Sequence, residues 1–181
     1  MRRSLFLLPA LALLFVPSAR AQESTSGRAE VALLVSLAGE YTYHYQEVGS
    51  PPGSGRIAFE SFADGRFLKL DETWGPGDGE AMSIQGFIGY DSVGGYFTWY
   101  RVFGNGSYDH GRGTLKDGTI TFEITESRTE AFGQDRWAGP GIQLRTKWTD
   151  FSDDGWTFIW ERSVDGGPWE FLSEGQNHRV R

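Results

Sequence analysis

Three observations predict an all-β protein, built as a single up-and-down antiparallel β-barrel of about nine or ten strands with one short N-terminal helix. Apolar and polar residues alternate along most of the chain, as in Thr119–Thr125, where Ile120, Phe122 and Ile124 share one face. Turn sequences separate these runs at short intervals. After the first apolar stretch almost nothing has helical spacing, so consecutive strands are expected to follow one another without helical crossovers.

The chain begins with the layout of a secretory signal peptide, residues 1–21. Arg2-Arg3 precede an apolar run over residues 5–16, and small residues at the A-x-A positions place the expected cleavage after Ala21. The apolar run is about a dozen residues long, whereas a membrane-spanning helix needs roughly twenty. The sequence therefore predicts an exported protein, periplasmic or secreted, with no membrane span after cleavage.

Residues 22–28 are polar and are expected to form a disordered leader. The apolar residues that follow recur at three- and four-residue spacing, which indicates one short helix. They are Val31, Leu33, Leu34, Leu37 and Ala38. Gly39 is expected to end this helix. The barrel domain is expected to occupy residues 29–181, because no internal repeat or low-complexity linker indicates a second domain.

Short turn sequences separate the expected strands from Gly39 onward. Many of them contain Asp-Gly or Asn-Gly, which supply the positive φ angles that tight hairpin turns require. They fall at residues 51–55, 63–65, 75–79, 91–95, 104–106, 116–118, 153–155 and 165–168. Such regular spacing is typical of a meander in which each strand pairs with the next.

One predicted hairpin is unusually aromatic. Around the turn at 91–95, the expected second strand, residues 96–103, carries rings at both parities. One face has Tyr96 and Tyr100, and the other has Phe97, Trp99 and Phe103. We expect the wall to be buried inside by core or ligand, and to be partly covered outside by the N-terminal helix or a partner subunit. The alternative is that the tyrosines lie half exposed, with their hydroxyls in water.

Composition excludes several classes of function. The chain has no cysteine, so disulfides, thiolate metal sites and cysteine nucleophiles are excluded. Removing Arg2, Arg3 and Arg20 from the 17 basic residues leaves 14 against 24 acidic ones, a net charge of about −10 that repels nucleic acid. The sequence has neither a Gly-x-Ser-x-Gly elbow nor a phosphate-binding loop. These features predict a protein that is not an enzyme and does not bind nucleic acid.

Residues 150–161 place Asp, Ser, Asp, Gly and Glu at positions that nearly match an EF-hand calcium loop. However, residues 156–162 alternate as a strand does. A strand would hold Glu161 far along the chain from Asp154, so the loop could not wrap an ion. The sequence therefore predicts a turn at 152–155 and no calcium site.

The three histidines also lack a metal-binding pattern. His44, His110 and His178 have none of the short spacings that zinc sites favour. His178 invites a haem hypothesis, because small barrels of the nitrobindin type hold haem through a histidine near the C-terminus. Only this position matches, and we expect no metal and no cofactor, with His178 a surface histidine in a basic tail.

Four segments resemble the bacterial lipocalin-like proteins grouped as domain of unknown function 1579. They are Leu37–Tyr43, Gly65–Leu68, Gly86–Asp91 and Asp165–Trp169. The resemblance covers most of the mature chain, and it implies a calycin-type barrel without an established activity. One departure is Gly39-Glu-Tyr41, where lipocalin-like chains usually have Gly-x-Trp. A buried Tyr41 hydroxyl would then need a hydrogen-bond partner.

Two functions remain. The first is a barrel that binds a small apolar or amphipathic ligand in its interior. By parity with Tyr41, the expected lining residues are Tyr43, Tyr45, Trp99 and Trp160, with Arg101 or Arg162 to pair a ligand carboxylate. The second is a structural or interaction barrel with a packed core, in which the outer rings of Tyr96 and Tyr100 dock a partner such as a second copy of the chain. A haem-binding barrel and a hydrolase are further alternatives.

Overall fold

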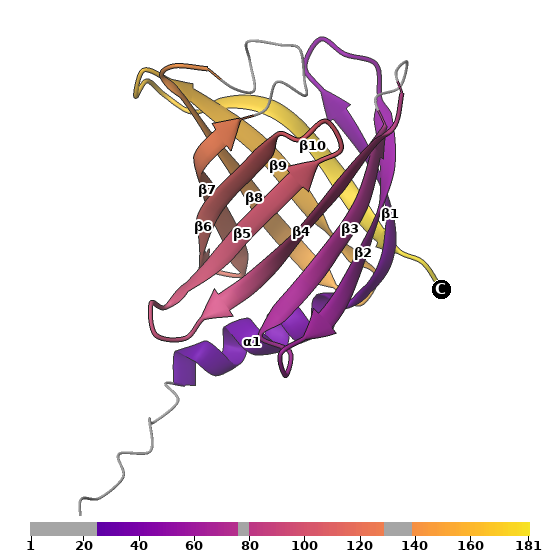
Figure 1. Ribbon diagram of the computed structural model, residues 1–181, viewed down its shortest axis with the longest axis vertical. Coiled ribbons are helices and arrows are strands. Elements are labelled where there is room, and N and C mark those ends of the chain that lie inside the picture. Colours follow the sequence, from indigo (N-terminus) through magenta and orange to yellow (C-terminus); the bar gives the residue numbers. More distant parts are fainter. Residues whose placement is uncertain (1–24, 76–79, 129–138) are drawn as a thin grey trace, which may run out of the picture.

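In the computed structural model, ten antiparallel strands close into a barrel, and one helix lies across one end of it (Figure 1). The structure describes residues 25–75, 80–128 and 139–181, so the expected signal peptide, 1–21, lies outside the described residues. The elements are α1 (Thr25–Leu37), β1 (Gly39–Glu47), β2 (Gly53–Phe62), β3 (Phe67–Gly75), β4 (Met82–Asp91), β5 (Tyr96–Phe103), β6 (Tyr108–Lys116), β7 (Thr119–Arg128), β8 (Ile142–Ser152), β9 (Gly155–Val164) and β10 (Glu170–Arg179).

The strand order confirms the predicted up-and-down barrel. Each strand pairs with the next one along the chain, and β1 pairs with β10 to close the ring. In that closing pair, Tyr41 lies opposite Arg179 and Tyr45 lies opposite Gly175. Each of these strands therefore has a hydrogen-bonded neighbour on both sides, which removes the exposed edges of an open sheet.

Turns connect the strands at most of the predicted places. They are observed at 63–65, 91–95, 104–106, 116–118, 153–155 and 165–168. In one of them the Asp91 carboxylate accepts two backbone N–H bonds of 2.9 Å from the turn that follows it, which explains the preference for Asp there. The turn expected at 51–55 was placed too late, because β2 already begins at Gly53. Most of the turn expected at 75–79 lies outside the described residues.

The helix α1 begins at Thr25, earlier than predicted. Residues 25–28 of the expected disordered leader are therefore helical, and residues 22–24 lie outside the described part of the chain. On the inner side of the helix, Leu34 and Leu37 are buried against the barrel end. No helix among the described residues is long and apolar enough to cross a membrane.

The half of the barrel nearest α1 is packed solid. Its inward side chains are fully or almost fully buried and include Leu34, Tyr41, Phe59, Leu68, Ile88, Phe97, Phe122, Trp148 and Trp156. Their rings meet edge to face or tilted, with centroids 4.7 Å apart for Tyr41 and Trp156 and 5.3 Å apart for Phe122 and Trp148. This half is the main hydrophobic core.

Strand β5 has the two aromatic faces that its sequence predicts. Phe97, Trp99 and Phe103 point into the barrel and are buried, whereas Tyr96 and Tyr100 are half-buried on the outer face. The helix crosses the end of the barrel and does not lie on this wall, so the expected cover by α1 was wrong (Figure 1).

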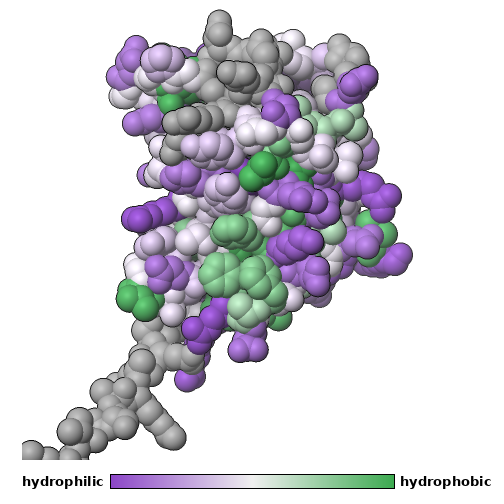
Figure 2. Space-filling model, viewed as in Figure 1, coloured by the Kyte–Doolittle hydropathy of each residue, from purple (hydrophilic) through white to green (hydrophobic). Residues whose placement is uncertain are grey.

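The outer rings instead cover one another. Tyr100 stacks between Phe87 and Tyr108, with centroid distances of 5.3 Å and 6.3 Å. Figure 2 shows apolar side chains gathered on the lower part of this face, within a surface that is otherwise mostly hydrophilic. Half-exposed tyrosines, the alternative expectation, are what the structure has.

Candidate ligand-binding site

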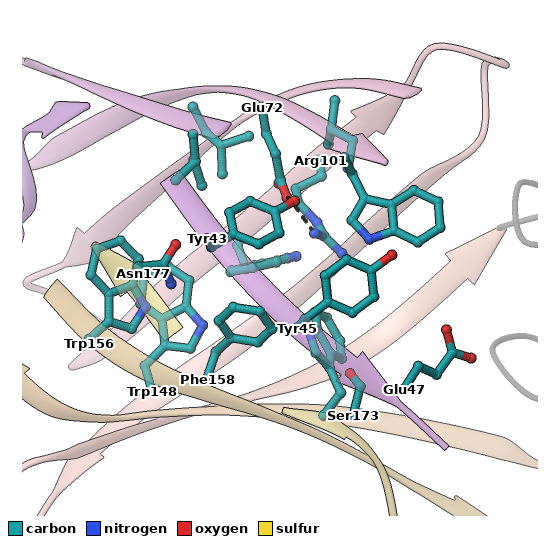
Figure 3. Close-up of a pocket in the computed structure, with 16 residues that line it drawn as sticks. Tyr43, Tyr45, Glu47, Glu72, Arg101, Trp148, Trp156, Phe158, Ser173 and Asn177 are labelled. Atoms are coloured by element: carbon teal, nitrogen blue, oxygen red, sulfur yellow. Dashed lines mark hydrogen bonds and ion pairs between the residues drawn. The ribbon is translucent and has the colours of Figure 1, made fainter. Parts of the chain in front are cut away.

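A cavity of about 90 Å³ occupies the half of the barrel away from α1 (Figure 3). Aromatic, aliphatic and polar side chains from β1 to β5 and from β8 to β10 line it. They are Tyr43, Tyr45, Glu47, Ile57, Leu70, Glu72, Trp74, Ile84, Trp99, Arg101, Trp148, Trp156, Phe158, Trp160, Ser173 and Asn177. Because a buried water needs roughly 10–15 Å³, this volume suits a ligand of on the order of six to nine water-sized groups.

The structure brings five of the six sequence-predicted residues to this cavity. Tyr43, Tyr45, Trp99, Arg101 and Trp160 all line it, so the inward parity inferred from Tyr41 was right. The sixth, Arg162, is not among the described lining residues. Its guanidinium instead pairs with Glu170, at 3.0 Å.

Two glycines of β2 determine where the β1 tyrosines lie. Gly55 is opposite Tyr43 and Gly53 is opposite Tyr45. A Cβ atom added at Gly55 would lie only 2.3 Å from Cζ of Tyr43, so the phenol ring occupies the space that a side chain would fill. The missing side chains of β2 thus let both rings lie flat against the wall, where Tyr45 also stacks on Trp74 at 5.8 Å.

A charged pair is buried in the wall beside the cavity. Arg101 donates from Nε to Oδ1 of Asp109 at 3.2 Å and from Nη2 to Oδ2 at 2.6 Å. Trp99 donates its indole N–H to the same Oδ1 at 2.7 Å. The guanidinium carbon also lies 4.6 Å from the centre of the Trp99 ring and 5.3 Å from that of Trp160. Bidentate hydrogen bonds and flanking rings hold this cation rigidly.

Glu72 is a second carboxylate on the same cation. Its Oε2 lies 3.8 Å from Nη1 of Arg101, and its Oε1 accepts a 2.5 Å hydrogen bond from the Tyr43 hydroxyl (Figure 3). Burial raises the pKa of Glu72, although Arg101 and the Tyr43 hydrogen bond act in the opposite direction. Burial and the Glu72 carboxylate together raise the pKa of Tyr43 well above its ordinary value, so this phenol is a neutral donor at physiological pH.

Arg101 therefore reaches the cavity with the protein's own carboxylates as partners. Burial acts to lower the pKa of Arg101, but Asp109 and Glu72 raise it overall, so the guanidinium stays charged. Sequence reasoning missed Glu72 and Asp109. The signal was their parity, because Glu72 alternates with the inward Leu70 and Trp74, and a carboxylate at a core position needs a buried partner.

The histidines do not contribute to the cavity. His178 lies on the outer face of β10 and is exposed, so the hypothesis that it holds haem inside the barrel was wrong. His44 is exposed on β1, and Nδ1 of His110 lies 2.9 Å from Oγ1 of Thr125. Within the part of the chain that the structure describes, no three His, Asp or Glu side chains gather as a metal site would require.

The EF-hand-like segment is a β-hairpin, as its alternation predicted. Residues 150–152 end β8, the chain turns at 153–154, and β9 carries Glu161 away from the turn. The Glu161 carboxylate pairs with Arg145 and Lys147 on the neighbouring strand. Partial burial acts to raise the pKa of Glu161, but the hydrogen bonds and charges of Arg145 and Lys147 lower it overall.

Tyr41 has the partner that its burial demands. Its hydroxyl donates to the backbone carbonyl of Leu37 at 3.1 Å, at the end of α1. The Arg179 guanidinium lies over the Tyr41 ring, with its central carbon 4.8 Å from the ring centre. Arg179 also donates to the carbonyls of Ala38 and Ser36, at 2.8 Å and 2.7 Å. The tyrosine at this position thus closes the barrel floor under the cavity and the core.

Solved structures share this architecture at low sequence identity. Rv2717c from M. tuberculosis is 16% identical, with a TM-score of 0.54 over 83% of this chain and 97% of that one. The S-type phycobiliprotein lyase CPES from Guillardia theta is 10% identical, with a TM-score of 0.55 over 88% of this chain and 98% of that one. These likenesses show the fold, a closed antiparallel barrel that resembles the calycin type. No family model matches the chain, and no curated protein sequence matches it.

Proposed function

We propose that the protein is an exported, non-enzymatic barrel that binds a small apolar or amphipathic ligand in the cavity opposite α1. One observation carries this proposal: the barrel is packed solid at one end and hollow at the other, and the hollow end is lined by rings around a buried polar cluster. Such a mostly apolar pocket with a few fixed polar groups is typical of small-molecule sites.

Two further features support the proposal. The signal-peptide pattern of residues 1–21 supports export. The absence of cysteine and of a serine elbow from the sequence supports binding without catalysis. We also infer that the four motif segments place the protein with the bacterial lipocalin-like proteins of domain of unknown function 1579, which fits the calycin-like barrel.

The proposal is tested first by native mass spectrometry of the protein purified from its own organism. A stoichiometric small molecule that dissociates on activation would identify the ligand. A second measurement is titration of the purified protein with neohexanol, a compact neutral amphiphile, followed by tryptophan fluorescence, since several tryptophans line the cavity. A bare mass together with titrations in which neither neohexanol nor a charged amphiphile of the same shape changes the fluorescence would contradict ligand binding.

A matched pair of substitutions separates the cavity from the core. Trp160 is half-buried at the cavity, so Trp160→Ala should abolish ligand binding and leave the far-ultraviolet circular dichroism unchanged. Phe122 is fully buried in the packed half, so Phe122→Ala should cost about 3–5 kcal/mol of unfolding free energy. If Trp160→Ala instead costs as much as Phe122→Ala and no ligand is found, the cavity is part of a packed core.

The outer aromatic surface supports a second candidate function. The stack of Phe87, Tyr100 and Tyr108 leaves Phe87 40% exposed on one wall. An interaction barrel would use this wall to dock a partner or a second copy of the chain. Analytical ultracentrifugation of the protein and of Tyr100→Ser tests this: a dimer that the substitution dissociates would favour the interaction barrel.

A further inference from the structure

We propose that the cavity selects ligands that carry a compact positive charge, such as an organic ammonium group, held beside Glu72 among the aromatic rings. This inference rests on the proposed ligand-binding function and names the chemical class of the ligand. It is carried by the charge balance of the cavity, by the geometry of Glu72, and by the rings that surround it.

The described side chains around the cavity hold more negative than positive charge. Glu72 and Arg101 line it, and Asp109 lies behind Arg101. Asp109 uses both of its oxygens on Arg101 and therefore neutralises that cation. Among these groups Glu72 remains as the carboxylate whose nearest described cation is distant, at 3.8 Å, and it is more than nine-tenths buried.

Glu72 is poorly compensated within the protein. Its ion pair with Arg101 has a distance of 3.8 Å, compared with 2.6 Å for the pair between Arg101 and Asp109. The Tyr43 hydroxyl supplies a hydrogen bond but no charge. An ionised carboxylate is costly to bury unless an opposite charge or several hydrogen bonds replace the water that it loses. A ligand ammonium in the cavity would supply that charge, and the raised pKa of Glu72 agrees with this shortage.

Aromatic rings complete a site suited to a cation. Tyr43 and Tyr45 lie with ring centroids 6.2 Å apart, and Tyr45 stacks on Trp74. All three line the cavity from the two strands β1 and β3, and Glu72 also belongs to β3. Electron-rich ring faces attract cations, most strongly where water is excluded. The wall already holds one cation in this way, since Arg101 lies against the rings of Trp99 and Trp160.

The same geometry argues against an anionic ligand. A ligand carboxylate would need Arg101, but the strongest hydrogen bonds of that guanidinium go to Asp109. It would also lie close to Glu72 and would be repelled by it. The expectation that Arg101 pairs a ligand carboxylate is therefore replaced by one in which Glu72 pairs a ligand cation.

Three ligands of nearly the same shape test the charge alone. Choline carries a trimethylammonium group, neohexanol replaces it by a neutral tert-butyl group, and tert-butylacetate adds a negative charge to that skeleton. Isothermal titration calorimetry of the purified protein should give an affinity for choline at least about tenfold higher than for the other two. Glu72→Gln should lower the choline affinity by about tenfold or more, and Glu60→Gln, on the outer face of β2, should leave it unchanged.

The outcomes separate the two proposals. If neohexanol or tert-butylacetate binds as tightly as choline or more tightly, the proposed preference for cations is wrong, but the proposed ligand binding is still supported. If none of the three binds and native mass spectrometry finds an uncharged or anionic molecule, the proposed preference for cations is again wrong, and ligand binding is supported. If none of the three binds and the protein has a bare mass, both the preference for cations and the ligand-binding function are contradicted. Because the comparison of the three ligands uses the unaltered protein, it remains decisive even if Glu72→Gln does not fold.

Discussion

At the residue scale, Arg101 shows how one side chain fixes another. A buried guanidinium is costly unless a carboxylate lies close to it and its other donors are satisfied. Asp109 on the neighbouring strand β6 meets this need with two hydrogen bonds, and the Trp99 indole N–H holds the same carboxylate in place. Trp99 and Arg101 therefore depend on Asp109 for their positions in the cavity wall.

Asp109→Asn should destabilise the fold strongly. The amide keeps the shape of the side chain but leaves Arg101 without its close countercharge, and breaking a buried ion pair costs about 3–5 kcal/mol. Urea unfolding followed by circular dichroism measures the change. Asp154→Asn is the matched control, because its ion pair with Arg181 is exposed to solvent and contributes little. Equal effects of the two substitutions would contradict the buried role of Asp109.

Glu72 should make stability depend on pH in a particular direction. Its pKa is raised in the folded protein, so between the ordinary value of 4.5 and the raised value the folded state binds more protons than the unfolded state. The contribution of Glu72 to stability is therefore greatest below this window and declines as the pH rises through it.

Glu72→Gln removes this titration. We expect the stability of the variant relative to the unaltered protein to increase as the pH rises from about 4 to about 7. Urea unfolding across that range, without ligand, measures the difference. Glu60→Gln, on the outer face, is the control: its unfolding free energy relative to the unaltered protein should not increase over this pH range. If the difference in unfolding free energy between Glu72→Gln and the unaltered protein did not change with pH, the pKa of Glu72 would not be raised in the folded protein.

Alternation in the sequence predicted the orientation of inward residues but not their partners. Tyr43, Tyr45 and Trp99 could be placed inside because a strand turns every second residue to the same face. The pairing of Arg101 with Asp109 depends on the register between β5 and β6, which puts the two residues directly opposite each other. Register is set by turn geometry and packing across the sheet. For that reason, the sequence suggested that Arg101 pairs a carboxylate of the ligand, whereas in the structure it pairs the carboxylate of Asp109.

At the element scale, one residue of the last strand adds charged hydrogen bonds to the packing that holds α1 on the barrel. Arg179 donates to the carbonyls of Ser36 and Ala38, where the helix ends and its carbonyls lack helical partners. Its position at a helix C-terminus is also electrostatically favourable for a cation. The sequence predicted the helix from apolar spacing, but this attachment joins residues too distant along the chain for any local pattern to show.

Arg179→Ala should loosen the floor of the barrel. We expect a loss of about 1–3 kcal/mol, because hydrogen bonds from a charged group to partly buried carbonyls are removed. Hydrogen exchange measured by mass spectrometry should show faster exchange over residues 25–37. Arg56→Ala is the control, since its pair with Glu40 is 3.8 Å long and largely exposed. Unchanged exchange in α1 would contradict the role given to Arg179.

At the scale of the whole molecule, the closed ring has one short seam. Strands β7 and β8 pair only between Ile120–Ile124 and Leu144–Trp148, although β7 continues to Arg128 beside β6. The other neighbouring pairs run over longer registers. The cavity lies in the same half of the barrel as the end of β7, which among the described strands pairs with β6 alone, so we expect the wall to open most easily at this seam.

Native-state hydrogen exchange tests this seam. Amides at Thr125–Arg128 should exchange by a local opening of lower free energy than amides of the closing pair, such as those at Tyr43 and Tyr45. The physical reason is that, among the strands that the structure describes, only β6 pairs with the end of β7. If β1 and β10 exchange first, the ring is weakest where its two terminal strands meet.

The pairing of β1 with β10 also affects how the protein folds during and after its synthesis. The first strand to leave the ribosome must wait for the last one before its outer edge is covered, and the arginine that fastens the floor is synthesised later still than most of that strand. Contacts between such distant residues form slowly. The export that we propose would benefit from this delay, because a barrel that cannot close early cannot obstruct its own passage through a narrow translocation channel.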